Sequence, residues 1–156
     1  MTRCETCGWR SVILAAAGVL LAAANQDEVE HSACAELIGG NAGVLLVSPL
    51  VVAEVCYMLG TRYGTEAEAL FLDSFADGTL LLARLSEVDM TRMAALVRQY
   101  SNLRLGASDA SVVALGERLR LTQVATLDRR HFTVVRPTHC PAFTLLPEPE
   151  QLSPNR

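Results

Sequence analysis

Short, uninterrupted apolar runs recur along this chain, and most of them are followed by a segment with helical spacing or a helix-start signal. A continuous apolar run of about four to eight residues is typical of a strand that is buried on both faces of a parallel sheet. Strands that alternate with helices predict an α/β domain with a mostly parallel central sheet. The predicted strands are Ser11–Ala15, Val44–Val47, Thr79–Leu85, Gln123–Leu127 and Phe143–Leu146.

The segments between these strands carry helix signals with a physical cause. Ser48-Pro49 predicts a helix start. A serine side chain can cap the unpaired N–H groups of the first turn, and proline fits there because the N–H that it lacks would have no partner within the helix. Thr65 and Glu68 form a capping-box pattern, and Ser108 is expected to open a further helix. The expected helices cover residues 18–24, 32–38, 50–64, 65–75, 90–100 and 108–121, and the DRRH segment at 128–131 is expected to form a polar turn.

The length of 156 residues suits one domain with a substantial core. Residues 1–10 have no periodic pattern and are expected to form a tail. The domain is predicted over residues 11–147, and the proline-rich residues 148–156 are expected to form a loose C-terminal tail.

The apolar run from Val12 to Asn25 allows a second interpretation. Basic residues followed by an apolar run and small residues are also the pattern of a secretory signal peptide. An exported protein would have its mature N-terminus near Asn25. The run is too short to span a bilayer, so the choice is between a leader and the first strand and helix of the domain.

The net charge of −4 gives no overall attraction to nucleic acid, so such a contact needs a local patch. Every one of the 13 basic residues is arginine, which favours bidentate contacts with phosphate where arginines cluster. Arg129 and Arg130 form such a pair and are predicted to bind the backbone of a polyanion. For Arg136, solvated surface charge is the preferred interpretation.

The five cysteines do not form the pattern of a disulfide framework. Cys4 and Cys7 could form a zinc site with His31, His139 and Cys140 as further ligands. His139 and Cys140 are adjacent rather than spaced as a ligand pair. Thiols without a metal are therefore the preferred interpretation.

Three acids are placed near the carboxyl ends of predicted strands, where open parallel sheets bind ligands. Asp128 ends a strand, Asp109 lies in the first turn of a helix, and Glu54 interrupts an apolar helical run. Taken singly, Asp109 could complement a helix dipole, Asp128 could be a turn residue, and Glu54 could pair with Arg104. Taken together, they predict a site for Mg²⁺ or Mn²⁺ that activates water against a phosphodiester.

The segments SPLVVAEV at 48–55, SDAS at 108–111 and ATLDRRHFTVVRP at 125–137 resemble bacterial PIN-domain toxins of the VapC type. The resemblance extends over about residues 12–146. It implies a three-layer α/β/α fold and a metal-dependent endoribonuclease that cleaves structured RNA such as tRNA or rRNA. It also implies a cytoplasmic homodimer, with no membrane contact, that a VapB-like antitoxin neutralises.

By motif match, the resemblance gives Glu54, Asp109 and Asp128 three of the family's acidic positions and makes Thr126 a residue that supports Asp128. The family has a further aspartate at the end of its first strand, and this chain has Ala16 there. Loss of that carboxylate is expected to weaken metal binding and cleavage. The leading hypothesis is therefore an impaired ribonuclease toxin. The alternatives are an inactive PIN-like module that binds an antitoxin or RNA and, third, the exported protein.

Overall fold

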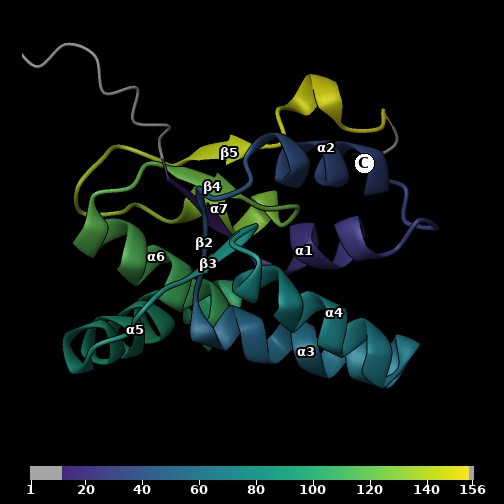
Figure 1. The fold of residues 1–156 in the computed structure, drawn as a ribbon. Helices are drawn as coiled ribbons and strands as arrows, with labels where there is room; N and C mark the ends of the chain where they lie inside the picture. Colours follow the sequence, from purple (N-terminus) through teal and green to yellow (C-terminus); the bar gives the residue numbers. More distant parts are fainter. Residues whose placement is uncertain (1–11, 155–156) are drawn as a thin grey trace, which may run out of the picture.

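The computed structural model describes residues 12–154, which form a central sheet with helices on both sides (Figure 1). The sheet is entirely parallel, with strand order β3-β2-β1-β4-β5. Its strands are β1 (Ile13–Ala15), β2 (Leu45–Val47), β3 (Leu80–Leu82), β4 (Gln123–Ala125) and β5 (Thr144–Leu146). The helices are α1 (Ala17–Ala24), α2 (His31–Gly40), α3 (Pro49–Tyr63), α4 (Thr65–Ala76), α5 (Glu87–Gln99), α6 (Ala107–Leu119) and α7 (Arg129–Val134), with the 3₁₀ turns η1 (Ser101–Leu103) and η2 (Pro149–Gln151).

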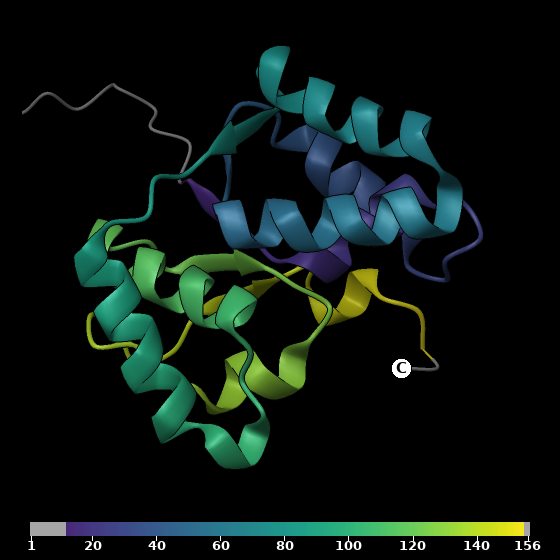
Figure 2. The same ribbon diagram turned by 90° about the horizontal axis from the view of Figure 1, so that it is seen from below.

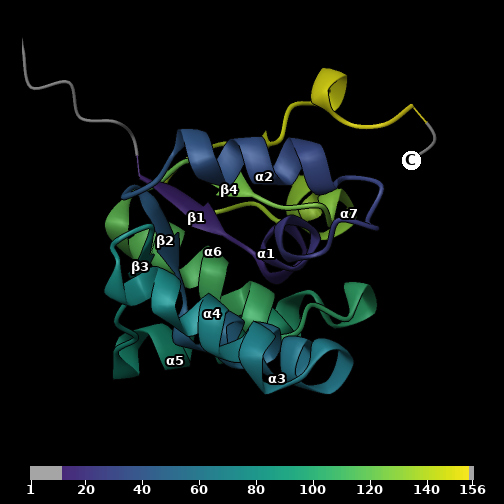
Figure 3. The ribbon, with the colours of Figure 1, turned by 45° about the vertical axis from the view of Figure 1, so that its right-hand side comes forward.

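The helices lie in two layers around the sheet. Helix α2 lies on one side, and α3, α4, α5 and α6 lie on the opposite side (Figures 1 and 3). Seen from that second side, α3 and α4 lie side by side, and α5 packs beside α6 (Figure 2). The three-layer α/β/α fold predicted from the sequence is confirmed. The predicted strands are in the right places, but each spans only three residues.

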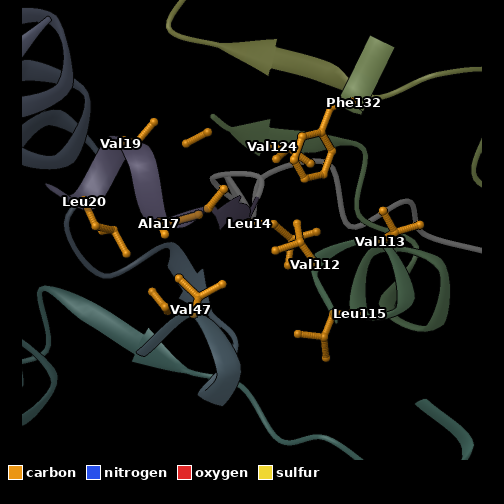
Figure 4. Close-up of a cluster of buried hydrophobic side chains, with 14 of the residues drawn as sticks. Leu14, Ala17, Val19, Leu20, Val47, Val112, Val113, Leu115, Val124 and Phe132 are labelled. Carbon is orange, nitrogen blue, oxygen red and sulfur yellow. The ribbon is translucent and has the colours of Figure 1, made fainter. Parts of the chain in front are cut away.

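Strand β1 is the centre of both the sheet and the core. It pairs with β2 on one side and β4 on the other, and its residues are buried. Leu14 belongs to one buried cluster with Val124 of β4, Val112 of α6 and Phe132 of α7 (Figure 4). The apolar run that resembles a leader therefore supplies the central strand and α1. A mature N-terminus near Asn25 would remove both from this fold.

Local capping confirms one of the three predicted helix starts. Ser48 caps α3, since its Oγ accepts a hydrogen bond from the Leu50 N–H at 3.2 Å. The predicted capping box at Thr65 is wrong, because Gly64 with a φ of 89° occupies the cap position and Thr65 is already helical. Similarly, α6 begins at Ala107 after Gly106, so Ser108 lies inside its first turn.

The predicted polar turn at 128–131 is also wrong, because this segment begins helix α7. Asp128 caps the helix by accepting a hydrogen bond from the His131 N–H. Phe132 then anchors it, since its side chain is fully buried and packs edge-on against Phe143 with ring centroids 6.3 Å apart. A Cβ at position 116 of α6 would lie 2.9 Å from the Phe143 ring, so Gly116 allows this close approach.

The segment after β5, which the sequence predicts to be loose, makes defined contacts over residues 147–154. Glu148 and Gln151 cap η2 reciprocally. The Ser153 N–H donates to the carboxylate of Glu30, with distances of 3.2 and 3.3 Å to its two oxygens, and Glu30 is buried. The predicted division into domain and tails stays a prediction, and residues 1–10 lie outside the described residues.

We expect Phe132→Ala to lower the free energy of unfolding by about 3–5 kcal/mol, because it leaves a cavity between α7 and Phe143. Val134→Ala on the same helix is the control, since Val134 is exposed and its truncation should change stability by less than about 0.5 kcal/mol. Urea denaturation followed by circular dichroism measures both. Equal midpoints for the two variants would contradict the assigned role of Phe132.

Candidate metal centre

Two of the predicted acids meet at the carboxyl edge of the sheet. Asp109 lies in the first turn of α6, and Asp128 follows β4 as the cap of α7. Both carboxylates are therefore at helix N-termini, where the helix dipole stabilises negative charge. Together with His131 they form a cluster whose ligand atoms all lie within 4.8 Å of one another.

His131 lies between the two carboxylates and is the residue of this cluster that the sequence analysis did not assign. Its Nδ1 is 3.0 Å from Oδ2 of Asp109 and 3.1 Å from Oδ2 of Asp128. Its Nε2 is 2.9 Å from the carbonyl oxygen of Leu103. Because a carbonyl oxygen only accepts hydrogen bonds, Nε2 carries a hydrogen and donates it to Leu103. Nδ1 therefore faces the carboxylates either with a proton or with a lone pair that can bind a cation.

The charges in this cluster act on one another. Burial raises the pKa of Asp109, and the charges of Asp128 and Glu54 raise it further, against the lowering effect of His131. Burial disfavours the charged form of His131, but the hydrogen bond with Asp109 and the charges of Asp128 and Asp109 outweigh it. The pKa of His131 is therefore raised above its usual value.

Glu54 differs from the sequence-based expectation. Although it interrupts an apolar run, its side chain is exposed, while Val51 and Val55 carry the buried face of α3. No ion pair with Arg104 exists within residues 12–154. Glu54 is outside the three-residue cluster, and it acts on Asp109 through its charge.

Ala16 is placed at the same edge of the sheet. It directly follows β1, and its N–H donates to the carbonyl oxygen of Ala125 at 2.9 Å, at the end of β4. The residue is buried and occupies the cap position of α1, where its side chain offers no hydrogen bond. An aspartate at this position would supply both a cap and a further carboxylate.

Thr126 supports Asp128 through the backbone. Its side chain is buried, and its Oγ1 accepts a hydrogen bond from the Asp128 N–H at 3.0 Å. This bond fixes the turn between β4 and α7. Thr126 therefore holds Asp128 through its backbone. Among the described residues, Thr126 makes no hydrogen bond with the Asp128 carboxylate.

The two predicted RNA-binding arginines have different surroundings. Arg129 is partly buried, and its Nη2 donates to the carbonyl oxygen of Pro147, whereas Arg130 is exposed. Both line a groove of about 730 Å³ beside Asp128. A second groove of about 660 Å³, which includes Arg104 and Arg130, lies beside His131.

The described residues contain no group of cysteine and histidine side chains that could form the alternative zinc site. Cys4 and Cys7 lie outside them. His139 contacts the carbonyl oxygen of Leu121 through Nε2 at 2.7 Å, with the sulfur of Cys140 3.6 Å from the same nitrogen. Within residues 12–154, Asp109, Asp128 and His131 form the one cluster of possible metal ligands.

The residues of this cluster suit a divalent cation. Carboxylate oxygens are preferred by Mg²⁺ and Mn²⁺, and an imidazole nitrogen is also accepted by Mn²⁺. The hydrogen bond from Nε2 to Leu103 orients the His131 ring in the way that hydrogen bonds commonly orient metal-binding histidines.

The domain comparison establishes the class of protein. The PIN-domain model matches residues 16–136 of the chain. The chain belongs to the PIN-domain family. Within it, the chain is similar to Ribonuclease VapC26 of Mycobacterium tuberculosis, with 40% identity over 128 residues that cover 82% of this chain and 95% of that protein. The family is therefore that of the VapC-type toxin ribonucleases, as the sequence motifs indicated.

Solved structures support the PIN fold. VapC20 of Mycobacterium tuberculosis, a toxin that cleaves the sarcin-ricin loop, matches with a TM-score of 0.66 and 14% identity, over 72% of this chain and 86% of that one. VapBC2 of Rickettsia felis, bound to a DNA fragment from its promoter, matches with a TM-score of 0.61 and 18% identity. That match covers 86% of this chain and 96% of the other. None of the helices within residues 12–154 is long and apolar enough to cross a membrane.

In the metal-free protein, we expect Asp128→Asn to lower the pKa of His131, because it removes one of the charges that raise this pKa. Asp73→Asn, at an exposed position of α4, should leave it unchanged. Proton NMR of the imidazole ring in EDTA measures both, and a His131→Gln variant assigns the signal. An unchanged pKa of His131 in Asp128→Asn would contradict the contact between His131 and Asp128.

The contacts of His131 with Asp109 and Asp128 also predict how the stability of the fold changes with pH. The folded pKa of His131 is raised, so the imidazolium stabilises the fold fully below the pKa of the unfolded chain. This contribution is lost as the pH rises through the folded pKa. Thermal melts of the metal-free protein and of His131→Gln should therefore differ most at acidic pH.

Proposed function

We propose that this chain is the toxin of a toxin–antitoxin pair and an Mg²⁺- or Mn²⁺-dependent endoribonuclease that cleaves structured RNA, with activity reduced by Ala16. The observation that carries the proposal is the convergence of Asp109 and Asp128 with His131 at the carboxyl edge of a PIN fold. Membership of the VapC-type ribonucleases supports the reaction class.

Asp109 and Asp128 would hold the metal ion, and Nδ1 of His131 is available as a third donor when it carries no proton. When bound, the ion supplies the positive charge that activates water and neutralises a phosphodiester. The chain's own contribution is positioning. Thr126 fixes the turn that carries Asp128, and the carbonyl of Leu103 orients His131.

Arg130 and Arg129 would bind the RNA backbone beside this centre. Arg130 is exposed, and it lines both grooves that include Asp128. A guanidinium in this place offers charge-assisted hydrogen bonds to phosphate. Since the net charge of the chain is −4, RNA binding would depend on this local arrangement of arginines.

Ala16 is the reason why we propose a reduced activity. With alanine at this position, the described cluster has two carboxylates, and Glu54 contributes only charge. Removing a principal ligand commonly lowers metal affinity and rate by orders of magnitude. The same observation favours a second candidate function, an inactive PIN module that binds an antitoxin or RNA without cleaving it.

The partners follow from the family. The structural match to VapBC2 of Rickettsia felis supports a VapB-like antitoxin for this chain as well. We propose that the toxin acts as a homodimer in the cytoplasm, on a tRNA or rRNA target.

We expect Ala16→Asp to tighten Mn²⁺ binding and to increase cleavage of total RNA by about tenfold or more, because it adds a carboxylate at the edge of the sheet that carries Asp128. Calorimetry measures the binding, and gel electrophoresis with Mg²⁺ or Mn²⁺ measures the cleavage.

Ala16→Asn is the matched control. Asparagine also caps α1 but adds no charge, so it separates a gain in helix stability from a gain in metal binding. If Ala16→Asp gains neither metal affinity nor cleavage over Ala16→Asn, residue 16 is not the missing ligand. Binding of RNA or antitoxin without cleavage would then favour the inactive module.

A further inference from the structure

The groove between α7 and the C-terminal segment has two chemically different walls. One wall carries Arg129 and Arg130 together with Asp128 of the metal centre. The other wall is formed by residues of the C-terminal segment, and Leu127, between β4 and α7, also lines the groove. The residues from the C-terminal segment are Pro149, Leu152, Ser153 and Pro154.

From these two walls we propose that the groove holds an unpaired nucleotide of the RNA substrate next to the phosphate that is cleaved, with its base against Leu152. This inference rests on the proposed ribonuclease function and adds a determinant of RNA selectivity to it. The C-terminal segment would then form part of the substrate site.

The chemistry of the groove matches a nucleotide. Proteins that hold a base outside the stack pack it between aromatic or apolar side chains, and arginines bind the adjoining phosphates. The volume of about 730 Å³ lies in the range of small-molecule sites. Positive charge from two arginines favours an anionic occupant over a basic peptide segment.

The position of the groove matches as well. Asp128 lines it and is also a member of the metal cluster, so an occupant lies directly beside that cluster. Arg130 and Asp128 line both this groove and the second groove, which also includes His131. An RNA strand that crosses the cluster would therefore pass from one groove into the other.

The C-terminal wall is held in place by contacts at both ends. Nη2 of Arg129 donates to the carbonyl oxygen of Pro147 at its start, and the Ser153 N–H donates to the buried carboxylate of Glu30 near its end. Arg129 therefore connects the two walls of the groove. Its Nε is buried and has no hydrogen-bond partner among the described residues.

The experiment compares Leu152→Ser with Glu150→Ser, an exposed position in the same segment that does not line the groove. The probe is a fluorescein-labelled, unstructured eight-nucleotide RNA, and fluorescence anisotropy in EDTA measures its affinity. We expect Leu152→Ser to weaken RNA binding by about fivefold or more, and Glu150→Ser to leave it unchanged. Leu152→Met keeps the apolar contact and should bind like the unchanged chain.

Two further readouts keep the result interpretable. Mn²⁺ affinity should be the same in all three variants, because none of these residues belongs to the metal cluster. Hydrogen exchange at the Ser153 amide reports whether the segment still contacts Glu30. Weaker RNA binding with the Ser153 amide still protected supports the proposal. If RNA binding is weaker in Leu152→Ser but the Ser153 amide is no longer protected, the effect comes from a change in the structure of the segment, and the proposal is overturned. Equally weak RNA binding in Leu152→Met overturns the proposal for the same reason.

Equal RNA affinity in Leu152→Ser and Glu150→Ser would also overturn the proposal. If the same Leu152→Ser protein bound the cognate antitoxin more weakly, the groove would be a protein site instead. Failure of the proposed ribonuclease function gives a different result from failure of the proposed nucleotide site. In that case Ala16→Asp does not cleave RNA, while RNA binding still depends on Leu152. If Ala16→Asp cleaves RNA but RNA binding does not depend on Leu152, the proposed ribonuclease function stands and only the proposed nucleotide site in the groove is overturned.

Discussion

Pairing of β1 on both of its edges is the constraint on which the rest of this molecule depends. A strand in the middle of a parallel sheet must be apolar on both faces, and Ile13, Leu14 and Ala15 satisfy this requirement. Because all strands run in one direction, their carboxyl ends lie at the same edge. The residues that follow β1 and β4 are thereby brought together from positions more than a hundred residues apart in the chain. Asp128 is placed by this arrangement of strands, whereas Asp109 comes from the first turn of α6, a helix that contacts β1.

At that edge, like charges are concentrated and need a counterion. Asp109 and Asp128 are placed at helix N-termini, which stabilises them only in part. The carboxylates raise the pKa of His131, and burial together with the charges of Asp128 and Glu54 raises the pKa of Asp109. A protonated imidazole and a divalent cation satisfy the same need. The cluster is therefore suited to exchange one for the other, which is consistent with the metal-dependent function that we propose.

The C-terminal segment connects this centre to a distant part of the chain. Arg129 contacts Pro147, and Ser153 contacts Glu30 in the connection between α1 and α2. A segment rich in proline and glutamate has little ability to form a helix or strand of its own, and these contacts give it a defined course. In this arrangement, the segment furthest from β1 in sequence lies beside the residues that β1 and β4 position.

The sequence by itself determined the fold class and the approximate place of every strand, because continuous apolar runs and helix starts are local patterns. It also placed Asp109 and Asp128 at strand or helix ends. Tertiary structure decided the remainder. Helix α7 forms where a polar turn was expected, because burial of Phe132 against Phe143 outweighs the local preference of DRRH. Likewise, His131 joins the cluster, Glu54 turns to solvent and the C-terminal segment meets Glu30, since each depends on residues far away in the chain that no local pattern can specify.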